Sequence, residues 1–479
     1  MMRRFALLLV FSLTGCMVGP DYHLPSFDTP ADWHGSKGQT SDRAMRDKTV
    51  AWWRDFKDTE LNALIEKALA NNENLKIAAA RVVEARGSRE TTDAALFPHI
   101  GAGASGERGN PGVPTLGGNA TIYQAAFDAS WEIDLFGGDR RQVEAQDALV
   151  GARQASYRDA CLSLVAEVAR EYISLRQFQA QLAITRQTAK IQHHLYEITQ
   201  DHFKGGLVST LDVAQAETLY KTTSARIPDY QRQIEASSYR LSVLLGEPPG
   251  GLDSLAVTRA SIPMVNNLPV LDAPADIVRQ RPDIAEAERN LAAATALQGV
   301  AISALYPKIS LSSLFGIQRG EVPHLGYEAT RTLWDIGSTV SMPIIEFGSI
   351  EGQIKAADAR QVQSLHQYRQ TVLAALGDIE IDLSNLTQET KRYRALQKAG
   401  KSADHAVDVA HDRYRGGLSD FTSVLQAEQQ RFAVQIELIA SQSSVAQDVI
   451  ALHKALGENP APVAETDKPD SEKTAETNQ

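Results

Sequence analysis

Apolar and polar residues alternate along most of the segment 119–136. The odd-numbered positions from Tyr123 onward are apolar, namely Tyr123, Ala125, Phe127, Ala129, Trp131, Ile133 and Leu135, and the even-numbered ones include Gln124, Asp128, Ser130, Glu132 and Asp134. A period of two predicts a β-strand with one apolar face. A weaker, Gly-rich strand is expected from Pro98 to about Glu107, and the turn-rich loop Arg108–Gly118 separates the two. Similar alternation predicts two more strands, around Ile309–Ile317 and Trp334–Ile344.

The segments after the strands have a helical pattern instead. The stretch 152–204 contains no Gly or Pro, and in the second half of the chain Leu425, Phe432, Ile439 and Ala446 recur every seven residues. Sustained spacing of three and four predicts coiled coil. A helix from about 138 to 204 would be ~100 Å long at ~1.5 Å per residue, which is too long for a globular domain.

Shorter signals predict how these helices begin, bend and turn. A further helix is expected from Leu61 to Ala95, before the first strand, because the segment lacks Pro and is rich in helix formers. The pairs Gly205-Gly206 and Gly416-Gly417 are expected to reverse the chain, giving two antiparallel hairpins. Pro228 is expected to kink the first return helix.

The chain also repeats itself. Asp201–Ala216 (DHFKGGLVSTLDVAQA) matches Asp412–Ala427 (DRYRGGLSDFTSVLQA) at an offset of 211, and Ala95–Pro98 matches Ala304–Pro307 at an offset of 209. We therefore predict a tandem duplication of one unit. The expected domains are a signal peptide (1–15), an N-terminal linker (16–59), a first repeat (60–250), a second linker (251–270), a second repeat (271–459) and a disordered tail (460–479).

The strand pattern favours membrane strands over a soluble sandwich. The predicted runs match the ~9–11 residues of a spanning strand, and Tyr123, Trp131 and Trp334 lie toward the ends of the apolar faces, as aromatic girdles do. Four strands cannot close a barrel, and an open sheet edge is not tolerated in lipid. Closure therefore needs other copies of the chain, and three copies would supply twelve strands.

The N-terminus is typical of a bacterial lipoprotein. A short basic start is followed by the apolar run Phe5–Leu13 and then by Leu13-Thr14-Gly15-Cys16, which resembles a lipobox. In that interpretation Cys16 becomes the first mature residue and carries acyl chains that anchor it to the membrane. Ordinary signal cleavage, with Cys16 left as a plain thiol, is the alternative. Lipoproteins with Asp directly after the lipidated Cys tend to stay in the inner membrane. This chain has Met17 there, which favours anchoring in the outer membrane.

Composition narrows the function further. The 479 residues carry 48 Lys+Arg against 59 Asp+Glu, a net charge of −11, which disfavours nucleic acid as a partner. With only two Cys there is no disulfide scaffold, and Cys161 is expected to be a buried structural residue. The neighbours His193 and His194 point ~100° apart on a helix, so they are not expected to bind a metal together. We predict no enzyme, cofactor or metal site; a covalent lipid on Cys16 is the one expected group.

Several strings give the chain a family resemblance. They are Gly19-Pro20-Asp21-Tyr22, Trp52-Trp53, Asn72-Glu73-Asn74-Leu75, Arg279-Gln280-Arg281-Pro282-Asp283-Ile284 and the two Gly-Gly turns. With the order of lipobox, strands, hairpin and repeat, the chain resembles the TolC-type outer-membrane factor family, in its lipoprotein efflux branch. The resemblance implies a mostly α fold with membrane strands, in which a homotrimer builds a twelve-stranded β-barrel on a twelve-helix α-barrel.

The resemblance also implies function and partners. It implies a passive outer-membrane exit duct for small molecules such as drugs or toxic compounds, extending into the periplasm. The expected partners are outer-membrane lipid, a periplasmic membrane-fusion adaptor and an inner-membrane pump, commonly of the resistance–nodulation–division type. Adaptor docking is expected at the hairpin-tip turns, formed by Gly205, Gly206, Leu207, Gly416, Gly417 and Leu418.

The family further implies a gate at the hairpin tips. Asp212 matches an acidic position after the first turn. Ser423 and Gln426 stand where two further Asp residues are common, so Asp420 is expected to substitute for them. Three copies of one Asp would form a ring that attracts cations. The alternative is that Asp212 and Asp420 are plain helix caps, and both roles can hold together.

Two other residues and two other functions belong to this interpretation. Tyr414 and Arg415 stand where latch contacts between helices occur in the family. A type I protein-secretion conduit would have the same architecture, but the lipobox favours efflux. A lipid-anchored coiled-coil tether without a pore would lack the membrane strands that the 119–136 alternation predicts.

Overall fold

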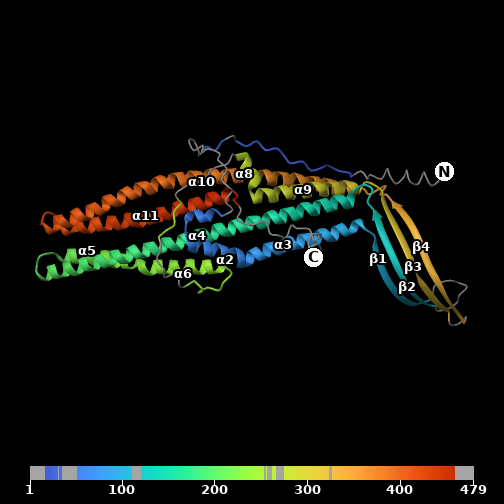
Figure 1. Cartoon of the computed structure of the whole chain (residues 1–479), viewed down its shortest axis with the longest axis horizontal. Coiled ribbons are helices and arrows are strands. Elements are labelled where there is room, and N and C mark those ends of the chain that lie inside the picture. Colours follow the sequence, from blue (N-terminus) through green and yellow to red (C-terminus); the bar gives the residue numbers. More distant parts are fainter. Residues whose placement is uncertain are drawn as a thin grey trace, which may run out of the picture. The chain divides into compact units, whose positions relative to one another are not determined.

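The structure is a computed structural model that describes residues 17–30, 32–34, 51–109, 120–252, 255, 261–265, 274–322 and 326–458. The predicted signal peptide, Cys16, most of the loop 108–118 and the predicted tail 460–479 lie outside the described residues. The helices and strands, in chain order (Figure 1), are α2 (Thr59–Asn71), α3 (Glu73–Asp93), β1 (His99–Gly109), β2 (Ala120–Ile133), α4 (Gly138–Lys204), α5 (Thr210–Ser224), α6 (Arg226–Leu244), α8 (Pro274–Gln280), α9 (Pro282–Ser303), β3 (Lys308–Val322), β4 (Tyr327–Ser341), α10 (Ser349–Arg415) and α11 (Phe421–Ala455).

The chain divides into two compact units, and each contains segments of both predicted repeats. The first unit comprises Met1–Phe27, Ala80–Ala155 and Ala285–Thr371, and the second comprises Asp28–Ala79, Ser156–Ile284 and Val372–Gln479. The sheet belongs to the first unit. Most of the buried apolar side chains belong to the second, where Trp52, Leu61 and Tyr172 are among the largest fully buried ones.

The four strands form one antiparallel sheet in the order β1-β2-β3-β4. Phe127 of β2 lies opposite Ala102 on one side and Phe315 on the other, and Phe315 lies opposite Trp334. The prediction of four alternating strands is therefore confirmed. One detail was wrong: the alternation around Trp334–Ile344 outlasts β4, which ends at Ser341, two residues before Pro343. Proline has no N–H to donate to a strand ladder.

The long helices have the expected limits. Helices α4 and α10 are both 67 residues long, and each is followed by a Gly-Gly turn and a return helix. Chain reversal at both glycine pairs is thus confirmed. The first return helix is interrupted near Pro228, as expected: α5 ends at Ser224 and α6 begins at Arg226. In the second hairpin α11 runs unbroken over 35 residues.

The single helix predicted from Leu61 to Ala95 was wrong. The structure divides it at Asn72, whose backbone is extended (φ −60°, ψ 127°). The Asn72 side chain accepts a hydrogen bond from the Leu75 amide at 3.0 Å and donates one to the Leu244 carbonyl oxygen at 2.9 Å. It therefore starts α3 as a cap while fixing this point to the end of α6.

Candidate functional site: hairpin tips and sheet

The two hairpin tips share one turn geometry, which the glycine pairs make possible. Gly206 and Gly417 have φ angles of 72° and 69°, in the left-handed region. The Leu207 amide donates to the His202 carbonyl oxygen at 2.9 Å, and the Leu418 amide to that of Arg413 at 2.8 Å. This pattern ends each long helix and satisfies its last carbonyl groups. Leu207 and Leu418 are left exposed at the tips.

Both predicted gate acids start return helices. Asp212 forms a capping box with Ser209: its carboxylate accepts from the Ser209 amide at 2.8 Å and from the Ser209 hydroxyl at 2.7 Å. Asp420 is itself the N-cap of α11 and accepts from the Ser423 amide at 3.1 Å and hydroxyl at 2.7 Å. The Ser423 hydroxyl, with the amide, lowers the pKa of Asp420. The alternative of a plain N-cap is therefore observed for Asp420, whereas in the first hairpin Ser209 is the N-cap and Asp212 is the third helical residue of the capping box.

Tyr414 joins the two hairpins. Its ring lies 5.4 Å from that of Phe421, beside an apolar cluster that includes Ala216 of the first hairpin and Leu425 of the second. Burial raises the pKa of Tyr414, and the negative charge of Asp212 adds to the rise. The structure thus brings Tyr414 and Asp212 near each other at the tips.

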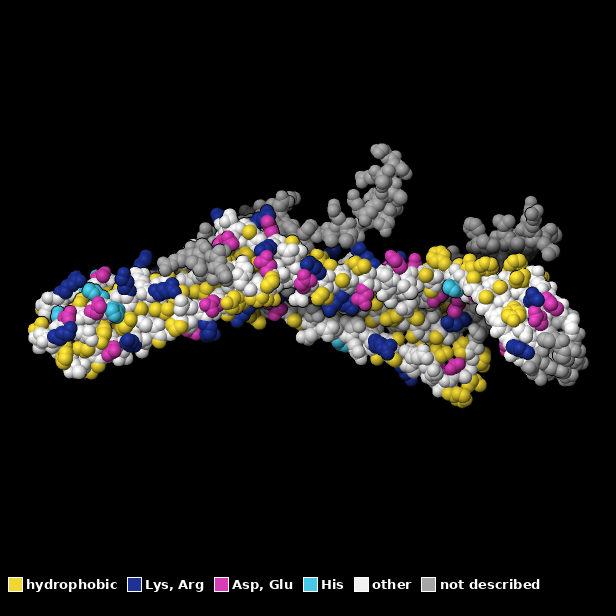
Figure 2. Space-filling model, turned by 90° about the horizontal axis from the view of Figure 1, so that it is seen from below, with side chains coloured by type: hydrophobic (Ala, Val, Ile, Leu, Met, Phe, Trp, Pro, Cys, Tyr) yellow, Lys and Arg dark blue, Asp and Glu magenta, His cyan; other side chains and the backbone are white. Residues whose placement is uncertain are grey.

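Arg415 lies differently. Its guanidinium pairs with Asp412 at 3.7 Å one helical turn away, and both side chains are largely exposed. Charged side chains of both signs surround the hairpin tips (left end of Figure 2). The latch role predicted for Arg415 stays a prediction.

A buried carboxylate near the second tip was not anticipated. The side chain of Glu428 on α11 is 1% exposed, lies 3.3 Å from His411 Nε2 on α10, and accepts a hydrogen bond from Arg431 Nη2 at 2.7 Å. It ties the two helices of this hairpin together. The internal repeat did not predict that Glu428 is buried, because Glu217, the matching residue of the first repeat, is exposed.

The sheet has an apolar face and a polar face. Large apolar side chains are exposed on alternate positions of all four strands: Ile100, Tyr123, Phe127, Phe315, Ile317, Trp334, Ile336 and Val340. The register aligns them across the sheet. The other face carries polar side chains, where Arg331 donates to Gln318 at 2.8 Å. Such a sheet suits lipid on one side and water on the other.

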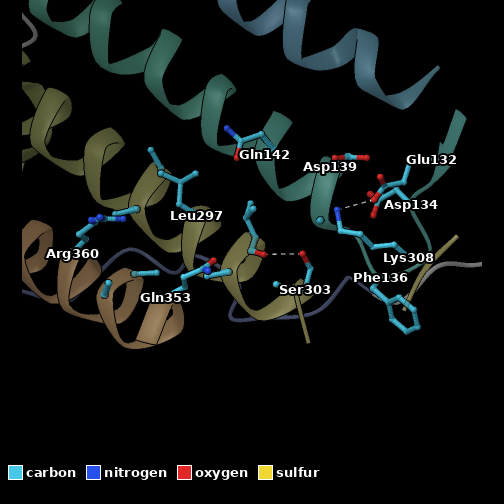
Figure 3. A pocket seen from close by; sticks show the side chains of 18 of the residues that line it. Glu132, Asp134, Phe136, Asp139, Gln142, Leu297, Ser303, Lys308, Gln353 and Arg360 are labelled. Atoms are coloured by element: carbon cyan, nitrogen blue, oxygen red, sulfur yellow. Dashed lines mark hydrogen bonds and ion pairs between the residues drawn. The ribbon is translucent and has the colours of Figure 1, made fainter. Parts of the chain in front are cut away.

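A pocket of about 800 Å³, lined by both apolar and charged side chains, lies where β2 meets α4 and α9 meets β3 (Figure 3). Lys308 Nζ lies 3.0 Å from Glu132 Oε1 at its edge. Burial raises the pKa of Asp139, and the charges of Asp134 and Glu132 raise it further.

The N-terminal segment is seated in the same unit by a buried arginine. Arg141 is 2% exposed, and its guanidinium donates to Asp21 and Glu144, each at 2.7 Å. It also donates to the carbonyl oxygens of Val18 and Gly19. The Gly19-Pro20-Asp21-Tyr22 string thus has a structural role that its sequence alone did not reveal. The one hint was Asp21, whose carboxylate needs a basic partner when it is packed against the protein.

Among the described residues, no three His, Cys, Asp or Glu side chains gather in a way that could hold a metal ion. Cys161 is a buried free thiol, and burial raises its pKa to about 11. No helix in the described part of the chain is both long and apolar enough to cross a membrane.

Comparison with known proteins decides the family. The family model described as "Outer membrane efflux protein" matches residues 64–247 and 273–458. The chain belongs to the outer membrane efflux protein family. It is 29% identical to nodulation protein T of Rhizobium leguminosarum bv. trifolii over 456 residues, covering 94% of this chain and 96% of that protein. It is 28% identical to the cation efflux system protein CusC of Escherichia coli O6:H1 over 452 residues, covering 94% and 97%.

The fold agrees with that of a solved outer-membrane channel. The outer-membrane channel OprN is 31% identical, superimposes with a TM-score of 0.86, and the match covers 93% of this chain and all of the OprN chain. The predicted fold class, four membrane strands joined to helical hairpins in a trimeric barrel, is thereby confirmed. This efflux protein is an outer-membrane channel that works in a tripartite system with an adaptor and an inner-membrane pump.

Proposed function

We propose that this efflux protein is a passive exit duct for small toxic molecules, closed at its periplasmic end by the hairpin tips. The observation that carries the proposal is the sheet: its apolar face suits lipid, its polar face suits an aqueous passage, and both its outer strands are available for pairing. Each pair of strands is followed along the chain by a helical hairpin, and the tips of the two hairpins carry acids and a tyrosine.

The proposed gate is a ring of three Asp212 carboxylates, one from each copy, with Asp420 next to it. Three like charges attract cations and disfavour anions. Their repulsion also costs free energy unless each charge is stabilised locally. The capping box supplies such stabilisation, because Ser209 donates two hydrogen bonds to Asp212. Capping and gating are compatible roles of the same side chain.

The proposed duct also implies particular partners and a particular origin of cargo selectivity. The exposed Leu207 and Leu418 at the turns are proposed to meet the periplasmic adaptor, and the pump is proposed to be of the resistance–nodulation–division type. Cys16 is proposed to carry the lipid anchor. The duct is proposed to be a passive conduit that does not itself select the cargo. The pump is therefore expected to choose the cargo, whether an organic compound or a metal cation.

Single-channel conductance in a planar bilayer tests the proposal. Wild-type protein should give a small, cation-selective conductance, and Asp212→Ala should raise it several-fold, because the ring of charges is lost. Asp201→Ala is the matched control: Asp201 is an exposed acid at the same tip that pairs with Lys204 on α4. Its removal should leave the conductance unchanged.

A second variant separates the gate from the cap. Asp212→Asn removes the charge but keeps a side-chain oxygen that can accept from Ser209. Opening by Asn as well as Ala supports a gate made by charge, whereas opening by Ala alone assigns the closure to the capped helix. If the protein forms a well-folded trimer that neither inserts into the bilayer nor conducts ions, the proposal that it is an exit duct is wrong.

A further inference from the structure

The internal repeat extends to the pairing of the strands. Strands β1 and β2 pair residues whose numbers add to 229, as His99 with Ser130, and β3 and β4 pair residues whose numbers add to 649, as Lys308 with Ser341. Moving β1 forward by 209 and β2 by 211, the two offsets found in the sequence, turns the first register into the second. The two hairpins of the sheet are therefore copies of one unit in register as well as in sequence.

The join between the two units is the contact of β2 with β3. Its partners have numbers that add to 442, and near the helical end Ile133 lies opposite Ile309. Just beyond, the rings of Phe136 and Tyr306 stack with centroids 4.7 Å apart and an angle of 24° between their planes. This join shows how the second strand of one unit meets the first strand of the next.

Resting on the proposed trimeric channel, we infer that neighbouring copies repeat this join: β4 of one copy pairs antiparallel with β1 of the next in the register whose residue numbers add to 444, and Phe347 stacks on Phe97 of that copy. The register follows from moving β2 forward by 211 and β3 back by 209. Phe347 is the repeat of Phe136, and Phe97 is the repeat of Tyr306.

The side chains that this join would bury are exposed in the single chain. Phe347 is 99% exposed and Phe97 is 64% exposed. Continued past the end of β4 at Ser341, the inferred register brings Ile344, 81% exposed, level with Ile100, 71% exposed, at the position that repeats the pairing of Ile133 with Ile309. Both pairs between copies thus have the same residue types as the pairs at the β2–β3 join within one chain: an aromatic ring on an aromatic ring, and an isoleucine opposite an isoleucine.

The faces of the sheet agree with the same register. The exposed apolar positions of β4 are even-numbered, as Trp334, Ile336 and Val340, and that of β1 is Ile100. Because 444 is even, even positions meet even positions and the apolar face continues across the join. A slip by one residue would place apolar side chains of one copy beside the polar face of the other, since side chains alternate with a period of two.

Cysteine crosslinking of the full-length trimer in membranes tests the register. Val340→Cys with Ala104→Cys is the inferred pair, and Ala129→Cys with Ser313→Cys is the same pair at the join inside one chain. Opposite residues of antiparallel strands lie ~4.5–5.5 Å apart, within reach of a disulfide. We expect crosslinked dimers and trimers on non-reducing gels for the first pair, and an internal bridge for the second.

The mismatched control is Val340→Cys with Ala102→Cys, which lies on the same face but two residues out of register. Diagonal neighbours are ~7–8 Å apart and should crosslink poorly. If this pair crosslinks and the first does not, the register is wrong while a conducting trimer keeps the proposed function. If the internal pair bridges but neither pair between copies does, the join itself is wrong.

The aromatic contact has its own readout in the heat needed to dissociate the trimer on a gel. Phe347→Ala and Phe97→Ala should each lower that temperature, and the double variant should lower it little more than either alone, because they remove one shared contact. Additive losses would overturn the stacking. Phe203→Ala, at an exposed aromatic near the first tip, is the matched control.

Discussion

Arg141 and Gly19 show how single residues seat the N-terminal segment. Gly19 has a φ of 90°, and a Cβ added to it would lie 2.5 Å from the Gly299 Cα atom. Only glycine permits both the conformation and the close approach of the two backbones. Beside it, the buried guanidinium of Arg141 binds Asp21 and two carbonyl groups of the segment.

Gly19→Ala should therefore release the segment. We expect faster hydrogen–deuterium exchange in peptides from residues 17–27, measured by mass spectrometry on the trimer. Gly206→Ala is the control, because Gly206 has a similar φ of 72° but no atom within 4 Å of an added Cβ. Both variants carry a left-handed strain of about 1–2 kcal/mol, so only the clash distinguishes them. Unchanged exchange in Gly19→Ala would contradict the seating described here.

The tip acids show one side chain with two candidate roles. Asp212 and Asp420 are each bound by the hydroxyl of a serine three residues away, so local helix capping explains their positions. Capping leaves the Asp420 side chain exposed and the Asp212 side chain partly exposed, so both remain accessible for a ring of acids in a channel. The comparison of Asp212→Ala with Asp212→Asn separates the two.

The packing of α10 and α11 contains a titratable site that local sequence does not show. Asp448 on α11 is partly buried, and burial raises its pKa to about 6, with the charges of Glu389 and Asp382 on α10 adding to the rise. Its ordinary pKa is ~3.9. Between these two values the folded chain holds more protons than the unfolded chain, so the free energy of unfolding falls as the pH rises through this window.

Asp448→Asn should remove this dependence. At pH 4 the variant and the wild type should have the same stability, and above pH 7 the variant should be more stable by about 1 kcal/mol, after allowance for partial exposure of the group. Thermal unfolding followed by circular dichroism at the two pH values measures it. Asp404→Asn, at an exposed acid on α10, should change neither value. A variant that is less stable at pH 7 would refute the assignment.

The helices illustrate why two copies of one unit differ. Both long helices span 67 residues, yet the first return helix is split into α5 and α6 while α11 is continuous. Pro228 has no backbone N–H to donate within a helix. It is therefore tolerated in the first turn of α6 but would break a continuous return helix. The internal repeat thus gives both halves the same hairpin, and Pro228 alone divides the return helix of the first one.

For the molecule as a whole, the sheet must face two solvents. Phe127 lies near the middle of β2 on the apolar face and is 64% exposed in the single chain. An arginine on the lipid face near the bilayer midplane costs ~2–4 kcal/mol. Phe127→Arg should therefore lower the yield of heat-resistant trimer in the outer membrane.

The matched variant is Gln124→Arg, at a polar-face position of the same strand opposite Gln318. It should assemble like the wild type, because a charge facing water is not desolvated. Gels of membrane fractions, run with and without heating, measure both. Equal assembly of the two variants would show that the apolar face does not meet lipid, and would remove the main support for the duct.

The sequence by itself determined those features that depend on local periods and on glycine. Alternation over 119–136 predicted β2, the Gly-Pro-free stretch predicted α4, and the two glycine pairs predicted the turns at Gly206 and Gly417. These features follow from side-chain spacing and backbone freedom within a few residues, which the chain carries in its order. The offsets of 209 and 211 also relate the register of β1 with β2 to that of β3 with β4.

The tertiary structure alone decided which polar groups became buried and which helices were divided. Burial of Glu428 and Arg141, the raised pKa of Asp448 and the break at Asn72 each depend on a partner distant along the chain or on a neighbouring helix. Burial, charge pairing and desolvation are properties of the packed neighbourhood, so residues that resemble each other in sequence, such as Glu217 and Glu428, end in different surroundings.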